Sequence, residues 1–353
     1  MTGPAVHGTF ADLFGDAELA AQFTPFALTA DMLAVEAALS RAVGHAGLLS
    51  QDVAEAAARA IEGAAPDAEA LALGTLRDGL PVPALVAELK RQISPELHPA
   101  VHPHSTSQDI LDTALMRALA RCNRVILARA ASLDEDLEAL DAHHGTAPLM
   151  ARTRMQAALP VTASHRIAQW RAPLGAAAAR LAALRPDLER VQLGGPVGDR
   201  RGYGAQGDAV ERHMADALGL HPAGACWHTD RSAVMTYGSG LATLAAALGK
   251  LGQDVALMAQ QGVGEIKIAG GGASSAMPHK ANPIGAETLV TLARLTAGHL
   301  GTLQGAMVHE QERSGSAWML EWLVLPQLVT ATGAALRTAT ALVASIERVG
   351  DRP

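Results

Sequence analysis

The feature that most constrains the fold is a series of long segments whose apolar residues recur at three- and four-residue spacing. The first begins at Thr106 and carries a broad apolar stripe as far as Ile126. Similar segments run from Ala157 to Val191, from Ser232 to Gln261 and from Ile284 to Met307, each with few internal breakers. Helices of about 25 residues or more indicate a bundle or a coiled coil. Because strict heptads do not persist, we predict a globular helical bundle.

The first part of the chain differs from the rest. It carries shorter helical patterns, such as Thr29 to Gly44, which are broken by prolines that cannot donate a backbone hydrogen bond. We therefore predict an N-terminal helical domain over residues 1–105 and a central long-helix bundle domain over residues 106–353. Since no segment alternates with the period of two that strands show, the predicted fold class is all-α. The breaking prolines are Pro66, Pro81, Pro83, Pro95, Pro99 and Pro103.

Composition restricts the partners and the compartment. The formal net charge of −7 argues against nucleic acid or an anionic membrane as the main partner, although a local cluster of cations would still bind an anionic substrate. The two cysteines, Cys122 and Cys226, have no paired spacing, which is typical of a reducing cytoplasm. We find neither a signal-peptide pattern nor a run of about 18 uninterrupted apolar residues. We expect a soluble, cytoplasmic protein.

Three polar segments lie at the ends or breaks of the long helical patterns, at Val101 to Asp109, Ala151 to Pro160 and Gly270 to Glu287. Each has an ordinary explanation by itself. Hydroxyls before a helix commonly cap it, an Arg-Thr-Arg run commonly lies on the surface, and a glycine-rich loop without a Walker pattern is weak evidence for phosphate binding. The nearby histidines lack acidic or cysteine partners at ligand spacing, so we predict no metal site; they are His98, His102 and His104.

Taken together, the three segments carry a resemblance. The string SSAMPHKANP, residues 274–283, is similar to the SS-x-MP-x-K-x-NP signature of the fumarase/aspartase superfamily. The TSQD form at residues 106–109 and the RT-xx-Q-xALP pattern at residues 152–160 most resemble the 3-carboxy-cis,cis-muconate cycloisomerase family within it. CWHTDR, GVGEI and HEQERSGSAWMLEW add support, and the likeness runs from about residue 10 to the end of the chain.

The resemblance implies a fumarase/aspartase-like subunit of three domains, whose central bundle assembles into a homotetramer. Each active site would be shared, with the three segments supplied by three different subunits. Polar patches spread along long antiparallel helices cannot all meet within one subunit, which agrees with this arrangement. The sequence stops at Pro353, about where the central bundle would end, so we expect the family's small C-terminal domain to be missing.

The implied chemistry uses no cofactor and no metal. Members of the superfamily remove a proton beside a carboxylate and expel a group from the adjacent carbon, or run this in reverse, through an aci-carboxylate that needs fixed donors and cations. In the cycloisomerases, a carboxylate of the muconate adds across the double bond of the same molecule and gives a lactone. The expected substrate is therefore a small polycarboxylate.

The resemblance also assigns roles. Ser274 would be the general acid/base, since a serine oxyanion needs stabilisation and Lys280 lies six residues away. His102 is a candidate for orientation or proton relay. Arg313 would pair with a substrate carboxylate, although a surface ion pair with Glu310 or Glu312 is the alternative. The other expected substrate contacts are Thr106, Ser107, Gln108, Arg152, Thr153, Gln156, Ser275, Met277 and Asn282.

The departures from the family pattern bear on the substrate. Many lyases of the superfamily carry a histidine, the acid for the leaving group, where this chain has Arg154. The cycloisomerases also lack that histidine, which fits a carboxylate that departs without a proton and disfavours lyases with amine leaving groups. Ala281 replaces a common arginine, and His104-Ser105 replaces a usual Gly-Ala. Two alternatives stay open: another lyase of the superfamily, and a non-catalytic binding protein on the same scaffold.

Overall fold

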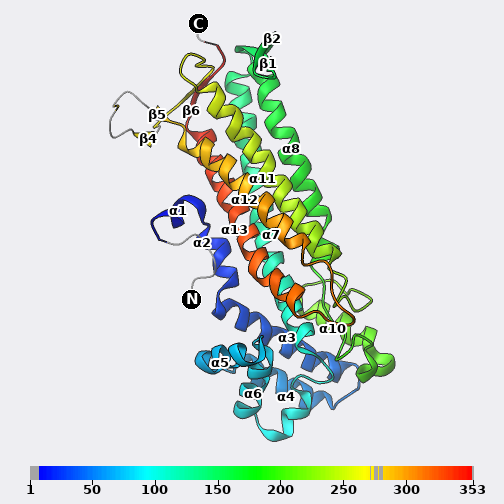
Figure 1. The fold of residues 1–353 in the computed structure, drawn as a ribbon. Coiled ribbons are helices and arrows are strands. Elements are labelled where there is room, and N and C mark those ends of the chain that lie inside the picture. The colour runs from blue at the N-terminus through cyan, green and yellow to red at the C-terminus, as the bar shows by residue number, and fades with distance from the viewer. Residues whose placement is uncertain (1–7, 271, 274–276, 278–280, 352–353) are drawn as a thin grey trace.

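Five long helices run side by side along the part of the chain that the structure describes (Figure 1). The structure is a computed structural model that describes residues 8–270, 272–273, 277 and 281–351. The predicted all-α fold class is confirmed. Three of the long helices begin within one residue of their predicted positions, a fourth begins later, as noted below, and the fifth, Ser316–Ala344, was not predicted. The five helices are α7 (Ser107–His144), α8 (Ala163–Ala183), α11 (Ser232–Met258), α12 (Ile284–Gln304) and α13 (Ser316–Ala344).

Shorter helices gather at one end of this bundle, the lower end in Figure 1. They pack around a second apolar core, separate from the core of the bundle, and this second core also takes in side chains between Val191 and Leu220. The division at residue 105 stays a prediction. The helices at this end are α3 (Pro25–His45), α4 (Gln51–Glu62), α5 (Ala68–Asp78), α6 (Val82–Gln92), η3 (Pro95–Ala100), η4 (Arg201–Gln206) and α10 (Gly207–Leu218). The remaining short helices are η1 (Gly8–Phe10), α1 (Ala11–Phe14), α2 (Ala17–Ala20), η2 (Ala21–Phe23) and α9 (Arg185–Leu188).

Short antiparallel strand pairs lie at the opposite end of the bundle. One pair corrects a prediction: the helix expected to start at Ala157 starts at Ala163, because residues 156–162 form a strand. Pro160 cannot donate in a helix, and the β-branched residues after it suit a strand, which explains the later start. The pairs are β1 (Pro148–Thr153) with β2 (Gln156–Thr162), β3 (Ile266–Ile268) with β6 (Ile346–Val349), and β4 (Gly272–Ala273) with β5 (Ala281–Asn282).

Small residues set the spacing between α11 and α12. A methyl group added at Gly249 would lie 2.5 Å from the Cβ of Ala293, and one added at Gly252 would lie 2.6 Å from the carbonyl oxygen of Ala286. The axes therefore approach more closely than larger side chains would allow.

Two of the bundle helices, α11 and α13, are long and apolar enough to cross a membrane by length and composition alone. In the structure, 61% and 67% of their most apolar windows are buried inside the protein. The core helices of a soluble bundle have the same character, so this feature is weak evidence for a membrane segment.

Candidate functional site

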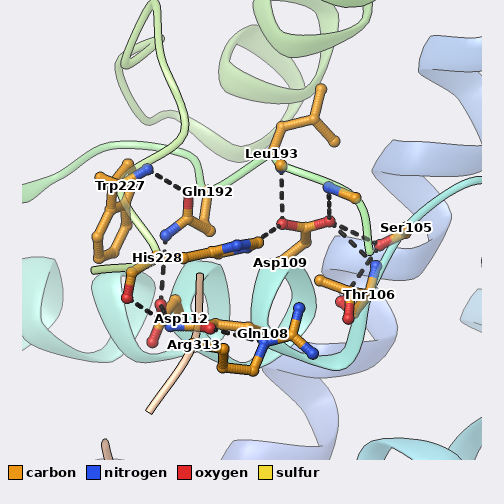
Figure 2. Close-up of polar contacts among 12 residues, drawn as sticks. Ser105, Thr106, Gln108, Asp109, Asp112, Gln192, Leu193, Trp227, His228 and Arg313 are labelled. Atoms are coloured by element: carbon orange, nitrogen blue, oxygen red, sulfur yellow. Dashed lines mark hydrogen bonds and ion pairs between the residues drawn. The ribbon is translucent and has the colours of Figure 1, made fainter. Parts of the chain in front are cut away.

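The first polar segment forms the start of α7, at the end of the bundle where the short helices gather (Figure 2). Thr106 is the residue before the helix, and its backbone N–H donates to the Asp109 carboxylate at 3.0 Å, the arrangement of a capping box. Thr106 and Ser107 are half-buried. A helix start offers unpaired N–H groups and a positive dipole end, so this position suits an anion.

Asp109 anchors this helix start to a distant loop. One carboxylate oxygen accepts the backbone N–H of Gly194 at 2.8 Å and Nε2 of His228 at 2.8 Å, and the other accepts the N–H of Gly195 at 2.9 Å. Burial lowers the pKa of His228, but the hydrogen bond to Asp109 and the nearby Cys226 raise it to about 9. His228 is therefore an imidazolium at neutral pH, paired with a fully buried carboxylate.

One turn further along α7, Asp112 takes part in a second buried network. Its carboxylate oxygens accept from Arg231 at 2.7 and 3.0 Å and from the indole nitrogen of Trp318 at 2.9 Å. Arg231 also donates to Glu321 at 2.8 and 2.6 Å. Burial raises the pKa of Asp112, but Arg231 outweighs it, and the pKa lies below its usual range. The network fixes α7 against the starts of α11 and α13.

Arg313 points at the start of α7, from the loop between α12 and α13 (Figure 2). Its Nε donates to the side-chain oxygen of Gln108 at 3.1 Å, and one terminal nitrogen donates to the carbonyl of Pro196 at 3.2 Å. In the described part of the chain it forms no ion pair with Glu310 or Glu312, the alternative that the sequence left open. A guanidinium is thus held beside the helix start.

Gln108 faces inward. It is fully buried, and its amide nitrogen donates to the carbonyl of His228 at 2.9 Å and to Asp112 at 3.2 Å. In this conformation both amide hydrogens are used within the chain, so Gln108 positions Arg313 and links it to the buried network.

His102 lies in the turn that precedes α7, with a positive φ of 58°. Its Nδ1 lies 2.7 Å from a carboxylate oxygen of Glu36, which is fully buried on α3. Burial lowers the pKa of His102, but the hydrogen bond and charge of Glu36 outweigh it and raise the pKa above its ordinary value. A paired carboxylate both orients the ring and favours its charged form, as a proton relay requires.

The second polar segment forms the hairpin β1–β2 at the far end of the bundle. Thr153 and Gln156 are the last paired residues, and Arg154 and Met155 form the turn with positive φ values of 49° and 68°. Arg152 donates to the buried carboxylate of Glu265 at 2.6 and 3.1 Å. Side chains at this turn are exposed.

The hairpin borders a cavity of about 400 Å³ that is rich in cations. Arg152 and Lys250 are paired there with Glu265 and Asp254, whereas Arg154 and Arg166 form no ion pair within the described residues. The local cluster of cations that the net charge left open is thus present. The cationic residues of the cavity are Arg152, Arg154, Arg166 and Lys250.

The end of the described chain ties these parts together. Strand β6 pairs with β3, which follows Glu265 directly. Beyond β6, the N–H of Gly350 donates to the carbonyl of Glu265 at 2.8 Å, and the N–H of Asp351 donates to the carbonyl of Pro148 at 2.8 Å. The base of the hairpin and the partner of Arg152 are therefore held by one short segment.

Part of the third polar segment, residues 271, 274–276 and 278–280, falls outside the described residues. Ser274, Ser275 and Lys280 belong to that part, and their assigned roles stay predictions. Met277 is 42% exposed, and Asn282 lies on β5, paired with Gly272. The strands β4 and β5 lie at the same end of the bundle as β1 and β2 in Figure 1.

The structure does not bring the three segments together within one chain. The first segment is at the start of α7 and the second follows its end, and a helix of 38 residues is roughly 57 Å long. His102, Thr106, Ser107, Gln108 and Arg313 therefore gather at one end, while Arg152, Thr153, Gln156 and Asn282 lie at the other.

The residues that surround the start of α7, among them His102, Thr106, Asp109 and Arg313, form the first cluster. Several members of this cluster were not assigned from the sequence. His228 and Arg231 lie within the quoted CWHTDR string, and Glu321 lies within HEQERSGSAWMLEW, but neither string indicated their partners. A local signal did exist for Asp109 and Asp112, since two acids three residues apart share one face of an otherwise apolar helix.

Comparison with known proteins identifies the family. The profile of the lyase family matches residues 16–298. A nitrosuccinate lyase from Streptomyces davaonensis is 37% identical over 92% of this chain and 71% of its own length. A 3-carboxy-cis,cis-muconate cycloisomerase from Pseudomonas aeruginosa is 34% identical over 98% of this chain and 77% of its own.

The fold agrees with these relatives. The crystal structure of a 3-carboxy-cis,cis-muconate lactonizing enzyme from Pseudomonas putida superposes with a TM-score of 0.89, at 33% identity, over 97% of this chain and 77% of that chain. These matches favour an enzyme over the non-catalytic alternative. The family profile covers most of the chain, and the solved structure shares its long-helix bundle. This chain therefore belongs to the lyase family and is an enzyme of the fumarase/aspartase superfamily.

Proposed function

We propose that this enzyme is a cycloisomerase that interconverts 3-carboxy-cis,cis-muconate and carboxymuconolactone, a reaction of aromatic catabolism. Relatives that carry the cycloisomerase name support the proposal at 34% and 35% identity over most of the chain. The reaction needs donors for several carboxylates and a group that exchanges a proton with carbon, and it needs no cofactor.

The observation that carries the proposal is Arg154. It occupies the exposed turn of β1–β2, directly after Arg152 and Thr153, and forms no ion pair within the described residues. A cation at this place cannot protonate a leaving group, but it stabilises one that departs as an anion. The carboxylate that leaves when the lactone opens is such a group.

The first cluster would hold another carboxylate of the substrate. Arg313 offers a planar guanidinium, and the start of α7 offers the hydroxyls of Thr106 and Ser107 together with a positive dipole end. His102, oriented by Glu36, would relay a proton, and Ser274 with Lys280 would exchange the proton at carbon.

A shared site follows from the layout. Because the first and second segments lie at opposite ends of α7, a pocket that uses both must take them from different chains. We propose a homotetramer in which helices of neighbouring chains pack antiparallel and bring the ends together.

A second candidate is a lyase that acts on nitrosuccinate, favoured by the relative of that name at 37% identity. Nitrite would be its leaving group, which also departs as an anion, so Arg154 fits both reactions. The two candidates therefore differ in substrate and share the demand for an unprotonated leaving group.

The deciding experiment offers the purified enzyme both substrates. We expect the diene absorbance of 3-carboxy-cis,cis-muconate to fall with the wild-type enzyme and with Ser239→Ala, a control serine variant within α11, but not with Ser274→Ala. Release of nitrite from nitrosuccinate without any reaction of the muconate would select the second candidate. Full activity of Ser274→Ala on either substrate would disprove the assigned acid/base.

Mixed chains test the shared site. Arg313→Ala, a variant damaged beside the first segment, should lose most of its activity, and Ser274→Ala should be inactive. If one site takes these segments from different chains, unfolding and refolding them together restores roughly a quarter of the wild-type activity, since random assembly gives that fraction of intact sites. A mixture no more active than its components would contradict sharing.

A further inference from the structure

Cys226, His228 and Asp109 form a linear set of side chains beside the start of α7. Nε2 of His228 lies 2.8 Å from the carboxylate of Asp109, and His228 is 98% buried, as its exposed fraction is 2%. Its other ring nitrogen, Nδ1, is also buried and has no hydrogen-bond partner of ordinary geometry among the described residues. Cys226, which is partly exposed, is the group next to the ring.

The cysteine and the histidine border one small space. A methyl group added at Gly194 would lie 2.5 Å from Sγ of Cys226 and 2.6 Å from Cε1 of His228. One added at Gly198 would lie 3.1 Å from the same Sγ and 3.7 Å from Nδ1 of His228. A side chain at Gly194 would therefore collide with the thiol and the ring, and one at Gly198 would crowd the thiol.

A nucleophile, a base and a carboxylate that orients the base are the parts of an activated thiol. The thiolate is the reactive form of cysteine, and an adjacent imidazolium is one of the environments that favours it. His228 is such a group at neutral pH, since Asp109 and Cys226 raise its pKa to about 9 against the opposing effect of burial. The reaction proposed above uses neither Cys226 nor His228.

We propose that Cys226 is a modification site, oxidised by hydrogen peroxide to a sulfenic acid with the support of His228 and Asp109. The thiolate sulfur attacks one peroxide oxygen, so that an S–O bond forms and the O–O bond breaks. The released hydroxide takes a proton from the imidazolium of His228 and leaves as water. Cysteine is oxidised and peroxide is reduced.

Oxidation of Cys226 would change the structure at the start of α7. The added oxygen enters the space beside Gly194, whose N–H donates to Asp109 at 2.8 Å. Because that space does not accept even a methyl group without displacement, the loop at Gly194 and Gly195 moves and its hold on Asp109 weakens. Asp109 in turn caps α7 at Thr106, so the modification loosens the helix start.

The chain supplies its own control in Cys122. This cysteine is fully buried on α7, and burial raises the pKa of its thiol to about 12. Treated with hydrogen peroxide and dimedone, the wild-type protein should trap sulfenic acid at Cys226 at least about tenfold faster than at Cys122, as mass spectrometry of peptides would show.

The role of the histidine is tested by two comparisons. In folded His228→Gln, checked by circular dichroism, trapping at Cys226 should slow about tenfold. In urea, where His228 no longer adjoins the thiol, the wild-type Cys226 should also react more slowly than in the folded chain, which decides the matter if the variant does not fold. Equal rates for Cys226 in the folded and unfolded chain would overturn the proposal.

The effect on the helix start has a separate measurement that requires no substrate. After peroxide treatment, hydrogen exchange at the amides of Gly194 and Gly195 should accelerate in wild type and stay unchanged in Cys226→Ser. Acceleration in both proteins, or in neither, would remove the link between the thiol and Asp109. All of these readouts are independent of the proposed reaction.

Discussion

Asp112 and Arg231 face each other through both carboxylate oxygens and both terminal guanidinium nitrogens, at 2.7 and 3.0 Å, with both side chains buried. Glu321 closes the other side of the same guanidinium. The pair joins the start of α7 to the starts of α11 and α13, which are far apart in the sequence. Buried ion pairs therefore hold three bundle helices together beside the candidate site.

Removing one member of this pair should be costly. Asp112→Asn leaves Arg231 buried with one carboxylate fewer, and we expect the free energy of unfolding in urea to fall by about 3–5 kcal/mol. Arg77→Met, which breaks an exposed ion pair with Asp78, serves as the control and should leave stability unchanged. Equal stability of wild type and Asp112→Asn would show that the buried pair adds nothing.

His228 should make stability depend on pH. Its folded pKa of about 9 lies above the ordinary 6.5, so its contribution is complete below pH 6.5 and is lost as the pH rises through 9. The free energy of unfolding should fall by up to about 3 kcal/mol across this window. Urea unfolding at several pH values measures the slope, which should vanish in His228→Gln and persist in the exposed control His165→Gln.

Two glycine substitutions of the same kind should have opposite effects. Gly252→Ala places a methyl group 2.6 Å from the carbonyl oxygen of Ala286, and the strain should lower stability by about 1–3 kcal/mol. Gly298→Ala, on the exposed face of α12 with nothing within 4 Å, should raise stability by about 0.5–1 kcal/mol through helix propensity. A loss at Gly298 would indicate that this face is covered in the assembly.

Arg313 should matter for turnover if it holds a substrate carboxylate. Arg313→Ala removes a charge-assisted hydrogen bond worth about 1.5–3 kcal/mol, so kcat/KM should fall by about 10- to 100-fold. Arg313→Lys should recover little, because an ammonium cannot donate in the same planar geometry. The exposed Arg294→Ala is the matched control on α12. An unchanged kcat/KM in Arg313→Ala would remove it from the site.

Local sequence signals were sufficient for three of the long helices, α7, α11 and α12, and insufficient for the contacts between the helices. The start of α7 follows from the hydroxyl and acid residues around Thr106, and α11 begins at the predicted Ser232. The strand at residues 156–162 was missed because a run of alanine and leucine fits a helix until Pro160 intervenes. Its hairpin partner, at residues 148–153, gave no separate signal.

The assignment of the site shows the same limit. The roles expected for Thr106, Gln108 and Arg313 stay predictions, although the structure places the Arg313 guanidinium against Gln108 at the start of α7. The bond from Gly194 to Asp109, however, spans 85 residues, and that from Arg231 to Asp112 spans 119. Such partners are chosen by the packing of the whole bundle, so no local pattern contains them.

The pairing of β6 with β3 has a consequence for how the far end of the bundle comes apart. Residues 346–351 hold both the segment that carries Glu265 and the base of the β1–β2 hairpin at Pro148. A protease cut between Ser345 and Ile346 would release residues 346–351, so that the pairing with β3 and the bond to Pro148 would both be lost, while α13 stays intact. Arg152 would then lose its fixed counter-ion without any change to its own strand, so a cut after Ser345 would alter a site nearly two hundred residues earlier in the sequence.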